Sequence, residues 1–186
     1  MDAIENILNR KSSKKLSLPY PNRNQMKLIY KAALRAPDHA WLRPSSFIEI
    51  TGKGLDKISK IFSDYAVDNI ENINEEKIKR YQSLPYRAPM IIVLITTIKK
   101  HPKVPDIEQL LSTAAAAQNI LLTLNALNYG GIWRTGTFAL NNKIGKYFNL
   151  SKNQEILGYL YIGTPNEESR KVPDIDINQF ITRWEW

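Results

Sequence analysis

The stretch M-I-I-V-L-I-T-T-I, from Met90 to Ile98, is a continuous apolar run preceded by Pro85 and Pro89. It is rich in β-branched side chains and shows no alternation of apolar with polar residues. Such a pattern is typical of a strand that is buried inside a sheet. The run therefore predicts a central buried strand, around which the rest of the chain is arranged.

The remaining elements are mostly helical. Two more strands are predicted over Ser46–Thr51 and Ile156–Ile162, each followed by glycine. Apolar residues at helical spacing predict helices over residues 4–8, 26–35, 55–65, 74–84, 106–128 and 140–148. The polar segment Arg10–Lys15 is expected to be an exposed connector, and the glycines of Tyr129–Gly136 are expected to end the long helix. Helices outnumber strands and do not alternate with them, which favours one α+β domain over residues 1–186.

Composition argues against several classes of protein. The 186 residues contain no Cys, which removes disulfides and thiol chemistry, and only two His, which are too few for a His-rich metal site. No apolar run reaches the roughly 18 residues of a membrane span. The acidic start M-D-A-I-E-N-I-L is unlike a signal peptide. A cytoplasmic protein without a metal centre and without a membrane partner is therefore expected.

The chain carries a net charge of +8, from 26 Lys and Arg against 18 Asp and Glu. An excess of cations suits either nucleic acid or an anionic small ligand such as a phosphate-bearing cofactor. The basic residues are scattered, with pairs at Lys14-Lys15 and Lys99-Lys100, and they form no dense stripe. A basic nucleic-acid-binding module is therefore the less favoured alternative.

The stretch R-A-P-D-H-A-W, from Arg35 to Trp41, places four chemically distinct side chains directly after a predicted helix. Pro37 disfavours helical geometry in the residue before it and accounts for the helix end. Asp38 and His39 suit an acid–base pair. Read by themselves, they are better explained as a capping carboxylate and a hydrogen-bonded imidazole.

Two other stretches have the chemistry of a ligand site. Arg10-Lys11-Ser12 offers two cations and a hydroxyl, which together can bind phosphate oxygens. In G-G-I-W-R-T-G, from Gly130 to Gly136, the glycines allow a flat ligand to approach the backbone while Trp133 and Arg134 stack or donate. The alternatives are a solvated basic connector and a glycine turn with a core tryptophan. No serine-nucleophile, zinc-protease or Walker motif is present, so no catalytic side chain is assigned.

Taken together, these stretches resemble the FMN-dependent nitroreductase family, and most closely its short, single-domain NAD(P)H nitroreductase branch. The resemblance runs nearly end to end. It is carried by M-D-A-I-E-N-I-L-N-R-K-S at residues 1–12, L-R-A-P-D-H at 34–39, Y-R-A-P-M-I-I-V at 86–93, K-V-P at 103–105, G-G-I-W-R-T-G at 130–136 and G-Y-L-Y-I-G-T-P at 158–165.

The resemblance implies a three-layer α+β sandwich with a mixed, mainly antiparallel sheet, and an intertwined homodimer with FMN at the subunit interface. It implies electron transfer from NAD(P)H through flavin N5 to an electron-poor acceptor such as a nitroaromatic or a quinone. The cofactor-binding residues that it implies are Arg10, Lys11 and Ser12 near the phosphate, Arg35 and His39 reaching the flavin from the other subunit, and Trp133, Arg134 and Thr135 along the cofactor.

Three departures from the family pattern stand out. Lys11 takes the place of a second arginine, and Thr135 takes the place of a serine. Arg43-Pro44-Ser45 stands where the family tends to have Gln-Pro-Trp, which changes the wall beside the flavin. This last departure leaves open a flavin-binding relative without reductase turnover, acting as a carrier or sensor. The apolar segment Phe180–Trp186 is expected to pack against another surface, for which a partner subunit is one candidate.

Overall fold

The computed structural model describes residues 2–166 and 172–184 of the chain. The strands are β1 Leu16–Ser17, β2 Ser45–Thr51, β3 Met90–Thr97, β4 Gly130–Arg134 and β5 Gln154–Pro165. The α-helices are α1 Ala3–Asn9, α2 Arg23–Ala33, α3 Gly54–Asn69, α4 Glu75–Ser83 and α5 Asp106–Ala126. Short 3₁₀-helices are η1 His39–Trp41, η2 Leu84–Arg87, η3 Gly136–Phe138, η4 Ile144–Phe148 and η5 Ile177–Gln179.

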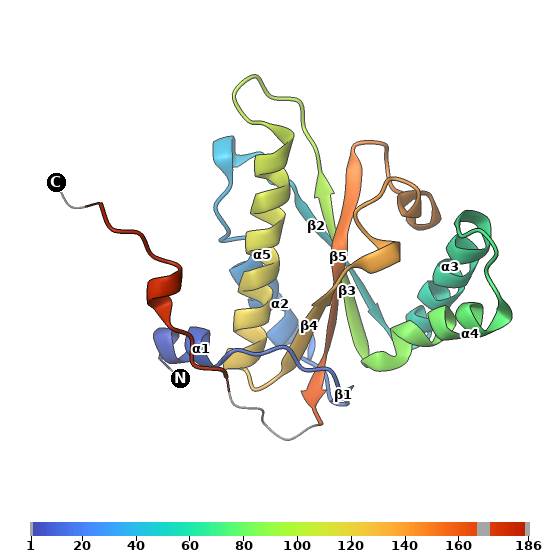
Figure 1. Cartoon of the computed structure of the whole chain (residues 1–186), viewed down its shortest axis with the longest axis horizontal. Coiled ribbons are helices and arrows are strands. Elements are labelled where there is room, and N and C mark those ends of the chain that lie inside the picture. Colours follow the sequence, from blue (N-terminus) through green and yellow to red (C-terminus); the bar gives the residue numbers. More distant parts are fainter. Residues whose placement is uncertain (1, 167–171, 185–186) are drawn as a thin grey trace.

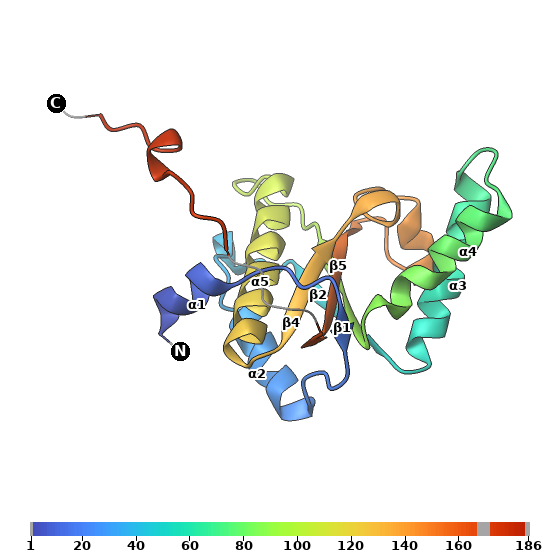
Figure 2. The same ribbon diagram turned by 60° about the horizontal axis from the view of Figure 1, so that its bottom comes forward.

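The five strands form one sheet whose named strands all pair antiparallel. Its order is β1-β5-β3-β2, and β4 also pairs with β5. Helices α2 and α5 cover one face, while α3 and α4 lie on the other (Figures 1 and 2). The α+β class and the layered, mainly antiparallel architecture are therefore confirmed.

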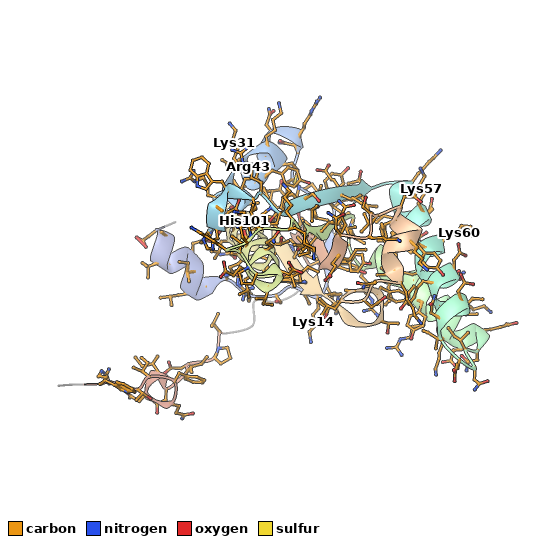
Figure 3. The ribbon with its side chains drawn as sticks, turned by 90° about the horizontal axis from the view of Figure 1, so that it is seen from above. Lys14, Lys31, Arg43, Lys57, Lys60 and His101 are labelled. Atoms are coloured by element: carbon orange, nitrogen blue, oxygen red, sulfur yellow. The ribbon has the colours of Figure 1, made fainter. Side chains whose placement is uncertain are left out.

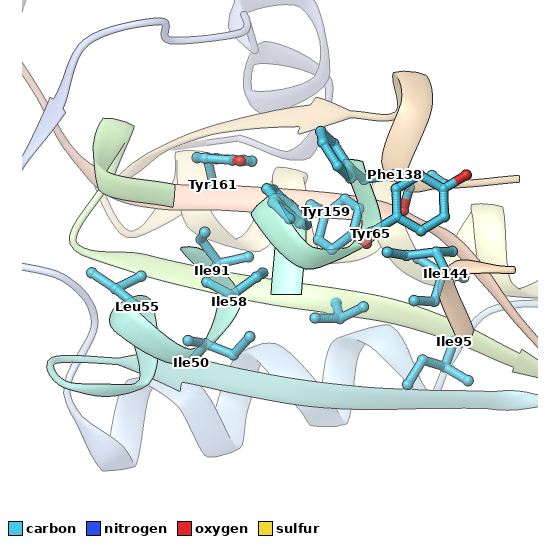
Figure 4. Close-up of a cluster of buried hydrophobic side chains, with 14 of the residues drawn as sticks. Ile50, Leu55, Ile58, Tyr65, Ile91, Ile95, Phe138, Ile144, Tyr159 and Tyr161 are labelled. Atoms are coloured by element: carbon cyan, nitrogen blue, oxygen red, sulfur yellow. Dashed lines mark hydrogen bonds between the residues drawn. The ribbon is translucent and has the colours of Figure 1, made fainter. Parts of the chain in front are cut away.

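Strand β3 lies between β2 and β5, and its side chains from Met90 to Thr96 are buried. Ile91, Val93 and Ile95 belong to the core under α3, which Figure 4 shows, whereas alternate residues of the strand pack under α2 and α5. Successive side chains of a strand point to opposite faces. Burial on both faces therefore requires a helical layer on each face, and the prediction of a central buried strand for this run is confirmed.

Most of the predicted elements form with ends within a few residues of those expected. Asp2 caps α1, because its carboxylate accepts hydrogen bonds from the backbone N–H groups of Ile4, at 2.7 Å, and Glu5. In the described part of the chain, no helix is both long and apolar enough to cross a lipid bilayer.

Three local expectations were wrong. The glycines of Tyr129–Gly136 do not end α5, which ends at Ala126, and the segment contains strand β4 instead. The connector after α1 is not wholly exposed, because Ser13 is buried and β1 follows it. Only Ile144–Phe148 of the helix predicted over residues 140–148 is helical, and it is a 3₁₀-helix.

Strand β5 contains a β-bulge that accepts a hydrogen bond from the side chain of Trp133. The β3–β5 register shifts so that Leu94 faces Gly158 and Ile95 faces Ile156, which leaves Leu157 as the extra residue. The Leu157 carbonyl accepts a hydrogen bond of 3.3 Å from the Trp133 indole N–H. Gly158 has φ +147°, and a Cβ there would lie 2.2 Å from the same indole nitrogen. Only glycine leaves room for the indole at this point.

Replacing Gly158 with alanine should therefore destabilise the protein. We expect Gly158→Ala to lower the free energy of unfolding by about 2–4 kcal/mol, since the side chain must displace Trp133 and the backbone conformation disfavours L-residues. Gly145→Ala is the matched control, because the Cβ would meet only Leu150, at 3.6 Å. Urea denaturation followed by tryptophan fluorescence measures both, and equal losses in the two variants would contradict the assignment.

The buried Tyr161 should make stability fall at alkaline pH. Burial raises the pKa of Tyr161 to about 12, against the opposing effect of the nearby Arg134 and Arg87 charges. An unfolded tyrosine ionises near pH ~10, so above that pH the unfolded chain loses a proton that the folded chain retains. The free energy of unfolding should thus fall by about 1.4 kcal/mol per pH unit between pH ~10 and ~12 from this residue alone. In Tyr161→Phe, the free energy of unfolding, taken relative to that variant's own value at pH 8, should fall less steeply with pH by that amount. Equal slopes in the variant and the unchanged protein would contradict the assignment of this effect to Tyr161.

Candidate functional site

The segment after α1 lies against strand β4. The backbone N–H of Ser13 donates to the Gly131 carbonyl at 3.2 Å, and Ser12 forms an isolated parallel bridge with Gly131. Two stretches that are far apart in the sequence, Arg10-Lys11-Ser12 and G-G-I-W-R-T-G, are therefore neighbours in the fold. Arg10 and Lys11 are half-buried, and Ser12 is exposed.

A small hollow opens where these two stretches meet. Its volume is about 50 Å³, and its lining includes Arg10, Lys11, Ser13, Asn125 and Gly131. A Cβ on Gly130 would lie 2.8 Å from both the Ser13 hydroxyl and a Pro165 carbon, and one on Gly131 would lie 2.8 Å from Leu121. These two glycines thus allow the amino-terminal segment and α5 to pack closely on β4, which places two cations at the start of the strand.

Strand β4 leaves part of one edge open. Gly131 turns its carbonyl away from β5 to bind Ser13, and backbone polar groups alternate in direction along a strand. The N–H and C=O groups of Trp133 therefore also point away from β5. Beyond them, Thr135, Gly136 and Thr137 are exposed. The edge thus offers backbone hydrogen-bonding groups next to the cations of Arg10 and Lys11.

The side chains of Trp133 and Arg134 lie on opposite faces of the sheet. Trp133 packs with the core under α5. The Arg134 guanidinium lies 5.6 Å from the centre of the Tyr161 ring on the other face. Its Nε is buried without a hydrogen-bond partner. The predicted site residues Trp133 and Arg134 are thus adjacent in sequence, but their side chains lie on opposite faces of the sheet.

The predicted residues of the R-A-P-D-H-A-W stretch lie elsewhere. Arg35 lines a cavity of about 520 Å³ between the end of α2 and the start of β2, together with Asp38, Trp41, Arg43 and Ser45. Asp38 and His39 do not form a pair. The Asp38 carboxylate accepts a 2.7 Å hydrogen bond from the Arg43 backbone N–H. The Asp38 side chain makes no capping hydrogen bond to η1, so the interpretation of Asp38 as a capping carboxylate was wrong, and its carboxylate orders the loop through Arg43 instead.

The imidazole of His39 is held by α5. Its Nδ1 lies 2.7 Å from a carboxylate oxygen of Glu108, and both side chains are partly exposed. Glu108 has no signal in the sequence that would connect it to His39. In the loop that follows Asp38 and His39, the backbone adopts left-handed conformations at Ala40, Trp41 and Arg43, with φ of 56°, 53° and 48°. The loop is therefore fixed by polar contacts in a conformation that most side chains disfavour.

Within one chain the predicted site residues form two separate groups. Arg10 lies near Asn125, whereas His39 contacts Glu108. These two residues of α5 are about 25 Å apart along the helix axis, at ~1.5 Å per residue. The structure thus brings Arg10, Lys11 and Ser12 close to β4, but it does not bring Arg35 and His39 to the same place. In the described residues, no cluster of three or more His, Asp or Glu side chains is suited to a metal ion.

Comparison with known proteins places the chain in one family. The model of the nitroreductase family matches residues 7–164. A protein of Escherichia coli K12 named "Putative NAD(P)H nitroreductase YdjA" is 33% identical over 94% of this chain and 96% of its own length. A similarly named protein of Haemophilus influenzae is 33% identical over 98% of this chain and 99% of its own.

Solved structures agree on the fold. A nitroreductase-like family protein from Bacillus cereus superposes with a TM-score of 0.85 at 21% identity, over 100% of this chain and 97% of its own. A nitroreductase with bound FMN from Bacteroides fragilis superposes with a TM-score of 0.75 at 17% identity, over the whole of both chains. With the family model covering most of the sequence and relatives matching almost end to end, this chain belongs to the nitroreductase family.

Proposed function

We propose that this protein is an FMN-dependent oxidoreductase that takes electrons from NAD(P)H and passes them to an electron-poor acceptor such as a nitroaromatic or a quinone. The observation that carries the proposal is the contact between the Arg10–Ser13 segment and the open edge of β4. Relatives with NAD(P)H nitroreductase names support the donor, and the FMN-bound family structure supports the cofactor.

The donor set suits a flavin mononucleotide. Arg10 and Lys11 supply positive charge and Ser12 supplies a hydroxyl, which is the chemistry that binds a phosphate group. The backbone groups of Trp133 and the hydroxyl of Thr135 suit the edge of a flat ring system with alternating donors and acceptors. A ligand with an anion at one end and a conjugated ring at the other thus matches the run of groups along β4.

Bound FMN supplies the hydride and electron chemistry. The chain's own residues bind and orient it: Arg10 and Ser12 hold the anionic end, and Trp133 and Thr135 hold the ring. The Lys11 and Arg134 charges favour added negative charge nearby. No side-chain nucleophile or general base is required, so His39, tied to Glu108, is assigned to binding.

The proposed assembly is a homodimer with shared cofactor sites. Neither Arg35 nor His39 lines the hollow beside Arg10 within one chain, and a second copy supplies them in the proposed arrangement. Residues 172–184 extend away from the sheet and its helices (Figures 1 and 2). They expose apolar side chains, among them Ile177, at 61%, and Phe180, at 75%. Covering these side chains with a partner removes apolar surface from water. The final residues 185 and 186 of the predicted packing segment lie outside the described residues.

The charge distribution does not favour the nucleic-acid alternative. Lys14, Lys31, Arg43, Lys57 and Lys60 point from several sides of the molecule (Figure 3). Binding to a nucleic acid backbone needs cations gathered on one face. The alternative of a flavin protein without turnover rests on Arg43 and Ser45, both of which line the cavity at the end of α2.

Binding of FMN and oxidation of NAD(P)H test the proposal directly. The full chain, incubated with FMN and separated from free ligand, should carry one flavin per protomer and oxidise NADH or NADPH with a nitroaromatic or quinone present. Arg10→Ala should weaken FMN binding by about 10–100-fold, because charge-assisted hydrogen bonds contribute roughly 1.5–3 kcal/mol each. Arg23→Ala, which removes the same charge from the exposed start of α2, should leave affinity unchanged.

Each negative result of these experiments would lead to a different conclusion. Flavin binding without NAD(P)H oxidation would favour the carrier or sensor. A colourless protein whose DNA affinity falls steeply with salt would favour the nucleic-acid module. Equal FMN affinity in the Arg10 and Arg23 variants would remove the phosphate assignment.

The extended carboxy-terminal segment should control assembly. Phe180→Asp places a charge on the apolar segment and should shift the protein from dimer to monomer, since burying an unpaired carboxylate is costly. Gln179→Glu adds the same charge at the neighbouring position and should leave the dimer intact. Sedimentation velocity measures the change, and FMN affinity should fall together with dimer content. A Phe180→Asp protein that remains dimeric with unchanged FMN affinity would contradict both the role of the segment and the shared site.

A further inference from the structure

The imidazole of His39 has one ring nitrogen in a hydrogen bond and the other without one. Its Nδ1 lies 2.7 Å from a carboxylate oxygen of Glu108, in the first turn of α5. Across the part of the chain that the structure describes, Nε2 makes no hydrogen bond. An ionised carboxylate only accepts hydrogen bonds, so the hydrogen in this contact belongs to Nδ1. The Glu108 contact therefore decides which nitrogen of the neutral ring carries the hydrogen.

The loop of His39 and the start of α5 are joined at a second point close to this pair. Gln109, next to Glu108, is buried, and its amide exchanges two hydrogen bonds of 2.9 Å with the backbone of Lys99. The Lys99 ammonium donates to the carbonyl of Leu42, in the same loop as His39, at 2.6 Å. The imidazole and the carboxylate are thus carried by two segments whose backbones are tied together.

The His39–Glu108 pair has a clearer effect on orientation than on stability. The two side chains are 55% and 43% exposed. Exposed pairs of this kind contribute little to stability, because water screens the charges and the side chains lose freedom. A carboxylate on Nδ1 nevertheless orients the ring and leaves the lone pair of Nε2 available. In the neutral ring, Nε2 is then a hydrogen-bond acceptor.

The second histidine has the opposite arrangement. The backbone N–H of Lys103 donates to Nδ1 of His101 at 3.2 Å. A ring nitrogen that accepts a hydrogen bond carries no hydrogen, so in the neutral His101 ring the hydrogen is on Nε2. The chain contains no other histidine. One molecule therefore holds one example of each tautomer, and each serves as the reference for the other.

An acceptor nitrogen selects the kind of ligand group that it contacts. FMN carries groups of both kinds: its phosphate and carbonyl oxygens accept hydrogen bonds, whereas its ring N3–H and its ribityl hydroxyls donate them. A neutral His39 with its hydrogen on Nδ1 suits the donors and does not suit the phosphate. The phosphate contact is thereby left to the cations of the Arg10–Ser12 segment.

We propose that Glu108 is a positioning residue, which holds His39 in the Nδ1–H form so that Nε2 accepts a hydrogen bond from the ring N–H or a ribityl hydroxyl of FMN. Glu108 acts through His39 and not on the cofactor itself. The tautomer is argued from contacts within one chain, whereas the identity of the ligand rests on the proposed function.

The tautomers can be measured by ¹⁵N NMR of the imidazole rings in the full chain without ligand, because protonated and unprotonated ring nitrogens differ widely in chemical shift. At pH ~9, above the ordinary range of histidine, His39 should carry its hydrogen on Nδ1 and His101 on Nε2. His101→Gln assigns the two sets of signals. Added FMN should leave His39 in the Nδ1–H form. A hydrogen on Nε2 of His39, with or without FMN, would overturn the proposal.

Substitutions at Glu108 separate orientation from charge. Glu108→Leu removes the acceptor, so part of His39 should change to the Nε2–H form, and FMN affinity should fall by about 3–10-fold, the size of one neutral hydrogen bond. Glu108→Gln keeps an oxygen that accepts the Nδ1 hydrogen, so it should keep the tautomer and an affinity within about 2-fold of the unchanged protein. The matched control Asp106→Leu, in the same exposed turn of α5, should change neither.

The results distinguish this proposal from the proposed function. Equal losses of affinity in Glu108→Leu and Glu108→Gln would assign the effect to charge and overturn the positioning role, as would an unchanged tautomer in Glu108→Leu. If Glu108→Leu does not fold, the spectra of the unchanged protein and of Glu108→Gln decide. A chain that shows both expected tautomers but binds no FMN would reject the proposed function and leave the effect of Glu108 on His39 standing.

Discussion

The double-sided burial of β3 is the constraint on which the rest of this structure depends. Ile91, Ile92, Val93 and Leu94 are all completely buried, although their side chains alternate between the two faces of the sheet. Removing each such side chain from water contributes roughly 1.5–3 kcal/mol, so neither face can be left to solvent. Helices α2 and α5 cover one face and α3 and α4 cover the other, which leaves the edges of the sheet for ligands. The candidate cofactor site at β4 is one of these edges.

The bulge at Gly158 connects that core to the site. It turns the Leu157 carbonyl toward the Trp133 indole and leaves space for the ring beside the backbone of β5. The indole packs in the core under α5 while the backbone of the same residue faces the open edge. The ligand-facing groups of such a site belong to a strand that is anchored in the core, and preorganisation of this kind reduces the entropy lost on binding.

Long, strongly patterned elements could be predicted from the sequence, and elements formed by pairing could not. The run at Met90–Ile98 shows no alternation of apolar with polar residues, which is typical of a buried strand. The helix that begins at Asp106 is long and has apolar residues at helical spacing. Both patterns are visible in the sequence itself. Strand β4 begins with two glycines and has five residues, so it resembles a turn until β5 is placed beside it. The two candidate ligand-binding stretches are visible as motifs in the sequence, but the contact between them depends on tertiary pairing of Ser12 and Ser13 with Gly131. No spacing rule connects His39 to Glu108, because their contact is created by the packing of the loop after α2 against α5.

The loop from Asp38 to Arg43 is difficult to explain in a single chain. Three of its residues adopt left-handed backbone conformations, each at a cost of roughly 1–2 kcal/mol. It also exposes 81% of Trp41. Contacts through Asp38, through His39 with Glu108, and between the Lys99 ammonium and the Leu42 carbonyl, at 2.6 Å, hold this conformation in place. In the proposed homodimer, contacts with a second copy would offset both the left-handed backbone and the exposure of Trp41, since the loop carries His39 and Trp41 toward that copy. The same proposed arrangement supplies Arg35 and His39 to the β4 edge, whose neighbouring hollow they do not line within their own chain.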